Sequence, residues 1–511
     1  MTVVPDFAAF AKSYRAGVAQ TVSTRLVADL ETPVSALLKL AEGAPNSFLF
    51  ESVEGGATRG RYSFLGFKPD LIWRAKGDQV EINRDALRDP TGFSPCPGKP
   101  LDSLRALIAE SRMDTPATLP PMAAGLFGFM GYDMVRQIER LPDSNPDELG
   151  IPDSIFLRPT MVCIFDHLED MATLVTPVWP KPGARNEADA KAAYAAAQAR
   201  LDDALKAFEG PLPYRHEAAS GAQPAPVPTS NTTRAEYHAI VERAKEYIRA
   251  GDIFQVVPSQ RFAVPFNLPP FALYRSLRRL NPSPFLFFMD FGGFTIVGSS
   301  PEILVRLRDG KVTIRPIAGT RPRGKTPAED QALAEDLLAD PKELSEHLML
   351  LDLGRNDVGR VAKIGSVRVT EQMIIERYSH VMHIVSNVEG EIDPGHDAID
   401  ALMAGFPAGT VSGAPKVRAM EIIDELEKTR RGVYGGAIGY FAANGAMDSC
   451  IALRTALVKD GTVYVQAGGG VVVDSDPEAE YQETQNKACA LVRAAEEAVQ
   501  FAAGVNAGEK R

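Results

Sequence analysis

Apolar and polar residues alternate along the chain with two periods, one typical of strands and one typical of helices. Alternating runs meet at Asp309-Gly310 and again at Asp460-Gly461, and Asp-Gly between such runs is a strong hairpin signal. Helical periodicity predicts helical segments at 187–208, 234–250, 327–351, 414–428 and 476–502. Hairpins require antiparallel pairing, so the pattern predicts an α+β fold with large antiparallel sheets and packed helices.

A stretch almost without large apolar residues interrupts these patterns at 209–232, EGPLPYRHEAASGAQPAPVPTSNT. Rich in Pro, Ala, Ser and Gly, it cannot bury a core and is typical of a linker or exposed loop. We therefore expect an N-terminal domain at 1–210, a linker at 211–232 and a C-terminal domain at 233–505.

Composition narrows the classes of function. The 511 residues carry a formal net charge of −11, which disfavours nucleic acid as a partner. Free thiols are expected because the four cysteines have no metal-ligand or CxxC spacing; they are Cys96, Cys163, Cys450 and Cys489. With no apolar stretch of about 20 residues and no signal-peptide pattern, we expect no membrane span and a cytoplasmic location.

Two predicted helices each present a pair of carboxylates near their first turn. Each helix begins with Asp-Pro, at 340–341 and at 476–477, which suits an N-cap followed by the first helical position. Three positions apart, and so on one helix face, lie Glu343 with Glu346 and Glu480 with Glu483. Four such carboxylates could surround Mg2+, which prefers oxygen ligands. Capping and the helix dipole explain the same glutamates without a metal, and spacing alone leaves both readings open.

Other polar residues stand among apolar neighbours. Arg454 is either paired or free to grip a ligand carboxylate. Glu302 begins an apolar run, where burial would raise its pKa toward proton transfer, although a solvated position is equally compatible. His383 is structural or catalytic. The turn at 409–415 could hold an anion, and the glycines at 468–470 allow close approach of a ligand, although loops also need glycine structurally.

Taken together, long motifs of the second half resemble the chorismate-utilising enzyme family, and within it the large subunits of anthranilate synthase. They include VGSSPEILV (297–305), RPIAGTRPRG (315–324), DPKELSEHLMLLDLGRNDVGR (340–360), FPAGTVSGAPKVRAMEII (406–423) and QAGGGVVVDSDPEAEYQETQNKA (466–488). The resemblance covers most of 250–490 in the family's order and is weaker in the first half. It implies a fold of two interlocked halves.

The resemblance also implies residue roles. Glu346 and Glu483 match direct Mg2+ ligands, with Glu343 and Glu480 in support. Residues that match substrate contacts are Gly319, Thr320, Thr410, Tyr434, Arg454, Gly468, Gly469, Gly470 and Lys487. Glu302 matches the general acid that protonates the departing 4-hydroxyl of chorismate, and His383 matches the histidine implicated in the loss of pyruvate.

The implied reaction joins chorismate and ammonia to give anthranilate and pyruvate for tryptophan biosynthesis. Relatives that add water carry a lysine base where this chain has Gln255, and para-aminobenzoate-pathway relatives carry lysine where it has Ala318. Both positions favour anthranilate. The alternative within the family is an aminodeoxychorismate synthase component I of the folate pathway. A rival of another class is a catalytically dead tryptophan-binding regulator, against which the intact Glu302, His383, Glu346 and Glu483 argue.

Regulation and partners are implied in the same way. Residues that match a feedback site for L-tryptophan are Glu51, Ser52, Asn281, Pro282, Pro284, Phe285 and Leu286. The chain departs from the usual pattern at Phe50 and Leu286, both of which stay apolar. It carries no glutaminase nucleophile motif and ends at Arg511. We therefore expect a separate glutamine amidotransferase subunit, component II, to supply ammonia in a heterotetramer of two large and two small subunits.

Overall fold

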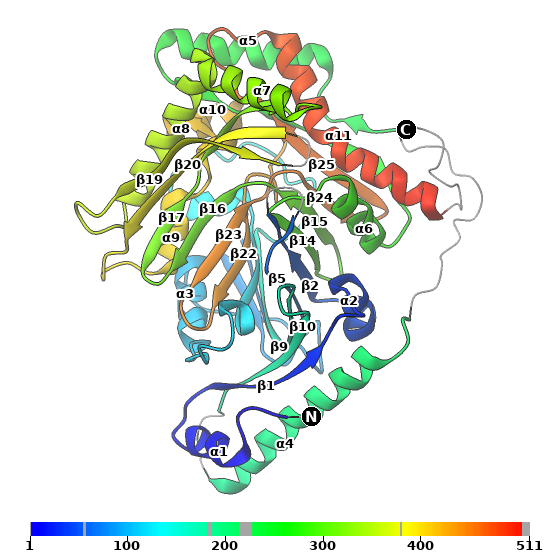
Figure 1. Ribbon diagram of the computed structural model, residues 1–511. Helices are drawn as coiled ribbons and strands as arrows, with labels where there is room; N and C mark the ends of the chain where they lie inside the picture. Colours follow the sequence, from blue (N-terminus) through cyan, green and yellow to red (C-terminus); the bar gives the residue numbers. More distant parts are fainter. Residues whose placement is uncertain are drawn as a thin grey trace.

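One extended antiparallel sheet organises the molecule, with helices packed around it (Figure 1). The computed structural model describes residues 2–54, 58–180, 183, 186–213, 227–378 and 381–502. Within these residues the main sheet has 21 strands. Mixed helix and antiparallel sheet is the class that the apolar pattern predicts, and the α+β prediction is confirmed.

The main elements of the first half are α1 (Phe7–Arg15), β1 (Gln20–Val27), α2 (Pro33–Ala41), β2 (Ser47–Glu51), β5 (Tyr62–Lys76), β6 (Gln79–Asn83), α3 (Pro100–Glu110), β8 (Gly125–Met130), β9 (Ser154–Asp166), β10 (Met171–Val178) and α4 (Glu187–Glu209). The second half begins with α5 (Arg234–Ala250), β13 (Ser259–Pro265), α6 (Pro270–Leu280), β14 (Phe285–Asp290), β15 (Thr295–Ser300), β16 (Ile303–Arg308), β17 (Lys311–Ile314) and β18 (Ile317–Pro322). It continues with α7 (Pro327–Ala339), α8 (Pro341–Gly359), β19 (Arg368–Arg377), β20 (Val381–Glu391), α9 (Ala398–Gly405), α10 (Lys416–Leu426), β22 (Ala437–Ala442), β23 (Met447–Ile451), β24 (Thr455–Lys459), β25 (Thr462–Gly468) and α11 (Pro477–Ala502).

Strands from the two sequence halves pair with each other, so the halves interlock. β2 pairs with β14, and β8 pairs with β22. At the second seam Gly128 lies opposite Gly439. A Cβ on Gly128 would stand 1.9 Å from the Ile155 backbone oxygen of β9, and one on Gly439 would stand 2.1 Å from the Asp448 backbone oxygen of β23. Only glycine at these two positions allows β8 and β22 to lie this close to their other neighbours, β9 and β23.

The predicted linker at 211–232 is described only at its ends. Residues 214–226 lie outside the described residues, as do 503–505 at the end of the predicted second domain. Near the linker's end, Thr229 and Ser230 form a short strand, β11, that pairs with β13. The domain boundaries stay a prediction.

Both predicted hairpins are confirmed, because β16 joins β17 at Asp309-Gly310 and β24 joins β25 at Asp460-Gly461. The turn residues have positive φ angles, 50° and 72° in the first turn and 48° and 71° in the second. Positive φ at both central residues is the geometry of a type I′ turn, whose twist suits a hairpin.

The predicted helical segments match α4, α5, α10 and α11, with one difference at 327–351. This segment is two helices, α7 and α8, that meet at Asp340, where a helix start was expected. Asp340 leaves helical geometry (φ −78°, ψ 110°), because a following proline disfavours it. Its carboxylate then caps the backbone N–H groups of Lys342 and Glu343. The second helix also runs on to Gly359.

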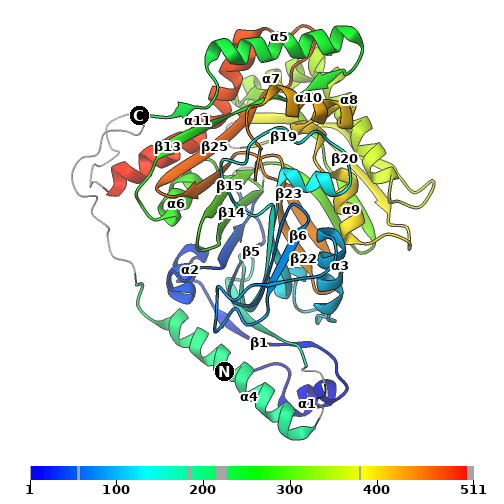
Figure 2. The ribbon, with the colours of Figure 1, turned by 180° about the vertical axis from the view of Figure 1, so that it is seen from behind.

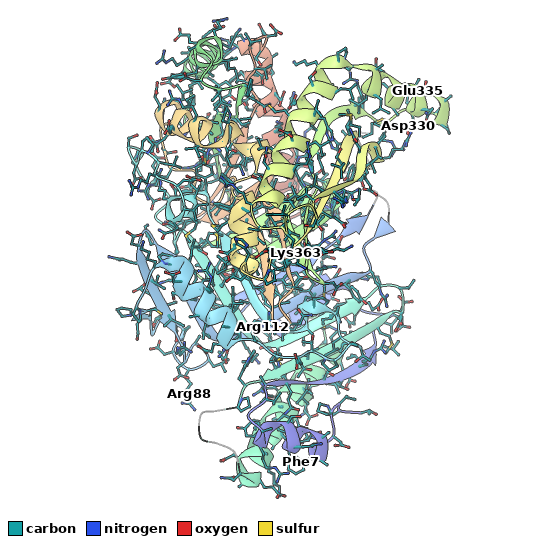
Figure 3. All side chains as sticks on the ribbon, turned by 90° about the vertical axis from the view of Figure 1, so that its left-hand side faces the viewer. Phe7, Arg88, Arg112, Asp330, Glu335 and Lys363 are labelled. Carbon is teal, nitrogen blue, oxygen red and sulfur yellow. The ribbon has the colours of Figure 1, made fainter. Side chains whose placement is uncertain are left out.

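Two groups of helices lie at opposite ends of the sheet, and α2, α3, α6 and α9 lie along its sides. α5, α7, α10 and α11 lie at the upper end of Figures 1 and 2, whereas α1 packs on α4 at the lower end. A quarter turn shows the same separation, with Asp330 and Glu335 of α7 far from Phe7 of α1 (Figure 3). At the upper end α8 packs on β18 and β20, and α11 packs on β25, which brings the two Asp-Pro helix starts to the same sheet.

Two expectations from composition can be compared with the structure. All four cysteines are free, as expected from their spacing. Among the described residues, no helix combines the length and apolar character that crossing a membrane requires.

Candidate active site

An unpaired guanidinium stands near the middle of the candidate site. Arg454 follows β23 in a left-handed backbone conformation (φ 49°) that non-glycine residues adopt rarely. Its side chain makes no hydrogen bond or ion pair with any described residue. Burial lowers the pKa of Arg454, and the nearby charge of Glu302 only partly opposes this. A shielded cation without a partner is costly, and an anionic ligand would remove that cost.

Glu302 is a buried carboxyl close to Arg454. Its side chain is 4% exposed, which decides between the two readings of the sequence in favour of burial. Burial raises the pKa of Glu302 to about 8, although a hydrogen bond from Thr410 favours the charged form. The Thr410 hydroxyl donates to Glu302 Oε1 at 2.9 Å. At neutral pH the carboxyl therefore keeps its proton and can donate it.

His383 lies on β20 directly opposite Thr320 of β18. Its Nδ1 is 2.9 Å from the Gly319 carbonyl oxygen, which can only accept, so Nδ1 carries the hydrogen. Burial lowers the pKa of His383 to about 4. The ring is therefore neutral at pH 7 and offers Nε2 as a proton acceptor. Gly319 has φ 67°, at a bulge in β18 that turns its carbonyl toward the ring.

The end of β25 forms a glycine-lined corner. A Cβ on Gly468 would lie 2.9 Å from the Tyr434 hydroxyl, one on Gly469 2.8 Å from Glu480 Oε2, and one on Gly470 2.5 Å from Gln255 Nε2. Lys487 donates to the Gly468 carbonyl at 3.0 Å. The three glycines thus let the backbone approach functional side chains that any larger residue would displace.

The four glutamates of α8 and α11 act on one another electrostatically. Burial raises the pKa of Glu346, and the charges of Glu343 and Glu483 raise it further. Burial likewise raises the pKa of Glu480, with Glu483 adding to the effect. The two helix starts therefore bring their carboxylates near enough to influence one another's protonation.

These carboxylates fit a hard divalent cation by the chemistry of their donors. All supply oxygen, and Glu480 Oε2 is buried without a hydrogen-bond partner among the described residues. Two of the four glutamates form ion pairs, Glu343 with Arg321 at 3.1 Å and Glu483 with Lys487 at 2.7 Å. Over the described part of the chain, no three His, Cys, Asp or Glu side chains stand close enough to form a metal cluster as they are.

Gln255 touches the same carboxylate group. Its side-chain amide donates to Glu346 Oε1 at 3.3 Å, and the residue is 3% exposed. An amide nitrogen has no basic lone pair, so this position can orient a carboxylate but cannot remove a proton from water.

A buried ion pair that supports the site was missed by the sequence reasoning. Arg431 pairs with Glu427 at 2.6 Å, and both side chains are at most 3% exposed. Arg431 also donates to the carbonyl oxygens of Val411 and Val257. The only signal in the sequence is the four-residue spacing of the pair, which is common on solvated helices as well.

The residues predicted for an inhibitor site lie together at the seam between β2 and β14. Glu51 is opposite Leu286, and its carboxylate accepts two hydrogen bonds from Arg278, both at 2.8 Å, and one from Tyr274 at 2.5 Å. Ser52 follows directly, and the next residue, Val53, bonds to the Ser283 carbonyl. Ser283 lies between Pro282 and Pro284, just after Asn281. Leu286 is only 2% exposed, whereas Phe285 is half-buried.

Comparison with known proteins identifies the relatives of this chain. A family model described as chorismate binding enzyme matches residues 46–493. Anthranilate synthase component 1 of Cereibacter sphaeroides is 63% identical over 497 residues, which are 97% of this chain and 98% of that protein. These matches confirm the resemblance inferred from the motifs.

Solved structures of related proteins share the fold of this chain. The crystal structure of anthranilate synthase component I from Streptococcus pneumoniae superposes with a TM-score of 0.71 at 38% identity, over 85% of this chain and 92% of that one. A menaquinone-specific isochorismate synthase from Escherichia coli has a TM-score of 0.67 over 96% of this chain and 98% of its own, but is 19% identical. This second likeness shows the shared fold alone.

The protonated state of Glu302 can be observed directly. We expect an infrared band of its carboxylic C=O that is lost on raising the pH with a midpoint near 8, and that is absent from Glu302→Gln. Because the Thr410 hydroxyl stabilises the carboxylate, Thr410→Val should move the midpoint higher. A midpoint in the ordinary glutamate range, about 4.3, would contradict the assigned burial effect.

Proposed function

We propose that this chain, which belongs to the chorismate binding enzyme family, converts chorismate and ammonia into anthranilate and pyruvate. It would act as the large component of an anthranilate synthase, the activity named for relatives that match it over nearly their full length. The observation that carries the proposal is the unpaired Arg454 beside a protonated Glu302.

Substrate binding follows from the distribution of charge. Chorismate carries two carboxylates, one on the ring and one on the enolpyruvyl group. We assign the enolpyruvyl carboxylate to Arg454, with Tyr434, Lys487 and the backbone at 468–470 around it. A guanidinium grips a carboxylate with two hydrogen bonds, which fixes the orientation of the substrate as well as its position.

The chemistry then needs only proton transfers. Ammonia forms a bond to C2 of the ring as the C4–O bond breaks; the 4-hydroxyl takes a proton from Glu302 and leaves as water, and the new ammonium group then gives up a proton, which restores that of Glu302. In the second step C2 loses its proton and the C3–O bond breaks, which makes the ring aromatic, and the released enolpyruvate takes up a proton at its methylene carbon to become pyruvate. Neutral His383, with its hydrogen on the Gly319 carbonyl, presents Nε2 as the acceptor for the C2 proton.

We assign Mg2+ to the carboxylates of α8 and α11, with Glu346 and Glu483 as direct ligands and Glu343 and Glu480 in support. The donor set and the unsatisfied Glu480 Oε2 favour this assignment. When bound, the cation would neutralise the ring carboxylate and hold it in place. The charges of Glu343 and Glu483 repel that of Glu346, and a bound divalent cation would relieve this repulsion.

Gln255 supports ammonia rather than water as the nucleophile, and Ala318 supports anthranilate rather than aminodeoxychorismate as the product. Gln255 donates to Glu346 and cannot activate water. Ala318 leaves no amine at the position where para-aminobenzoate relatives use lysine. The aminodeoxychorismate alternative therefore lacks support from the residues, and both anthranilate synthase comparisons favour anthranilate.

We further propose a partner and an inhibitor. The relatives are named component 1, which supports a separate component II. We propose that component II is a glutamine amidotransferase that supplies ammonia, in an assembly of two large and two small subunits. L-Tryptophan would bind at the β2–β14 seam, between Glu51 and Ser52 on one side and 281–286 on the other. The Glu51 carboxylate, which Arg278 and Tyr274 hold by hydrogen bonds, would bind the ammonium group of tryptophan.

Product analysis tests the function. Chorismate, ammonium and Mg2+ should yield a fluorescent product with the mass of anthranilate, and a chelator should stop its formation until Mg2+ is restored. A product that keeps its enolpyruvyl group would identify aminodeoxychorismate instead. Tryptophan binding with no turnover under these conditions would leave only the regulator.

Metal binding can be measured apart from turnover. With chorismate present and ammonia withheld, calorimetry should show that Glu483→Gln weakens Mg2+ binding at least tenfold, about 1.4 kcal/mol, because a neutral amide cannot balance the cation. Glu478→Gln is the matched control, since Glu478 lies on the same helix and pairs with Arg234 and His238. Equal Mg2+ affinity in Glu483→Gln and the control would remove Glu483 from the ligand set.

The inhibitor site is tested through Ser52. Ser52→Ala should raise the tryptophan concentration for half inhibition several-fold, because one hydrogen bond contributes about 0.5–1.5 kcal/mol, while uninhibited turnover is kept. Ser94→Ala, a change at an exposed serine, should leave the inhibition curve in place. An inhibition curve that is also unmoved in Ser52→Ala would exclude the β2–β14 seam as the site.

A further inference from the structure

A buried tyrosine that takes no part in the proposed proton transfers packs against His383. Tyr378 follows β19 directly and is 9% exposed. Its ring centroid lies 5.5 Å from that of His383, and the two ring planes meet at 62° in an edge-to-face arrangement. Aromatic rings favour this geometry, so the contact resists rotation of either ring. Tyr378 is also close enough to Arg454 and Glu302 to interact with both electrostatically.

The proposed role of His383 depends on the direction in which its ring points. The lone pair of Nε2 lies in the plane of the imidazole, so the ring can accept the C2 proton only along that plane. Nδ1 lies 2.9 Å from the Gly319 carbonyl oxygen and 3.1 Å from Thr320 Oγ1. Both polar contacts involve this one nitrogen, so packing must restrain the part of the ring that carries Nε2.

Tyr378 is itself held at its hydroxyl and at its backbone. The hydroxyl donates to Glu376 Oε2 at 2.8 Å, and the backbone N–H donates to the Val381 carbonyl oxygen at 2.8 Å. Arg323 donates to the Tyr378 carbonyl oxygen at 2.6 Å. Burial raises the pKa of Tyr378, and the Glu376 charge adds to this, so the hydroxyl keeps its proton and remains a donor. A ring fixed in this way can serve as a rigid support.

The carboxylate that holds Tyr378 is engaged on both of its oxygens. Glu376 Oε2 accepts from Tyr378, and Glu376 Oε1 accepts from Arg315, which also pairs with Glu371 at 2.8 Å. Glu376 lies directly opposite His383 in the pairing of β19 with β20. Both of its oxygens thus have donors other than the imidazole, which leaves Nε2 of His383 for the substrate.

We propose that Tyr378 is a positioning residue for the second step, and that its ring keeps the imidazole of His383 in the plane that directs Nε2 at the C2 proton. The inference rests on the proposed function, because it needs loss of that proton as a separate step. Addition of ammonia does not use His383. A tilted imidazole therefore slows only the second step, and the amino-substituted intermediate, which still carries its enolpyruvyl group, leaves the site before it reacts further.

The ratio of the two products tests the role of the ring. With chorismate, saturating ammonium and Mg2+, Tyr378→Leu should form anthranilate about tenfold more slowly or worse, because misplaced reacting groups lose at least this much rate. Consumption of chorismate should fall less than about threefold, with the intermediate as the main product by mass. Tyr378→Phe keeps the ring and should restore anthranilate as the main product.

Tyr247→Leu is the matched control. The Tyr247 hydroxyl also donates to a glutamate, Glu425, but Tyr247 lies on α5 outside the candidate site. We expect this variant to release anthranilate alone. A Tyr378→Leu enzyme in which chorismate consumption and anthranilate formation fall in equal proportion would overturn the proposal, because a merely structural residue has that effect.

Glu376→Ala decides the outcome if Tyr378→Leu does not fold. The Glu376 side chain is 32% exposed, so the change is tolerated, and it removes the acceptor of the Tyr378 hydroxyl while the ring stays. We expect release of the intermediate alongside anthranilate, whereas anthranilate alone would overturn the proposal. Failure of the wild-type chain to make anthranilate from ammonium would instead reject the proposed function, so the two failures are distinguishable.

Discussion

The ion pair between Arg431 and Glu427 links several segments of the candidate site to one another. Its guanidinium binds Glu427 and the carbonyl oxygens of Val411 and Val257, and it lies over the rings of Tyr132 and Tyr434. Glu427 in turn accepts from the backbone and hydroxyl of Ser259. The turn that carries Thr410, the strand after Gln255 and the Tyr434 ring are thus fixed to one buried charge pair. Loss of either partner would leave an uncompensated charge, which costs about 3–5 kcal/mol in a protein interior.

Burial sets the protonation states of three residues at the candidate site. The same desolvation keeps a proton on Glu302, keeps His383 neutral and favours an anionic ligand beside Arg454. The roles proposed for them, as acid, proton acceptor and anion-binding group, therefore share one physical cause acting on three residue types. Burial also raises the pKa of Glu346 and Glu480, but at these two residues the charges of neighbouring glutamates add to the shift, and a divalent cation would relieve that repulsion.

Features that depend on neighbouring residues could be predicted from the sequence, whereas features that depend on distant residues could not. The Asp-Gly hairpins and the Asp-Pro helix starts depend on neighbouring residues, so both could be predicted. The surroundings of Glu302 could not, because they include residues far away in the sequence such as Thr410, 108 residues on, whose hydroxyl donates to the carboxyl. Convergence of the two ExxE pairs became predictable only through the family resemblance, and the Arg431 pair had no distinguishing signal. The sequence analysis ended this helical segment at 351, whereas α8 runs on to Gly359. Many residues between 352 and 359 are polar, so the apolar periodicity that predicts a helix is weak there.

The pairing of β8 with β22, in which Gly128 lies opposite Gly439, has a consequence for dissection of the molecule. Sheet edges that meet there and between β2 and β14 are completed only by strands from the other half. A gene divided within 211–232 would therefore yield two fragments, each baring strand edges that template aggregation. Such fragments would regain the sheet only by meeting during folding, which makes co-expression, rather than separate refolding, the route to a split version of this enzyme.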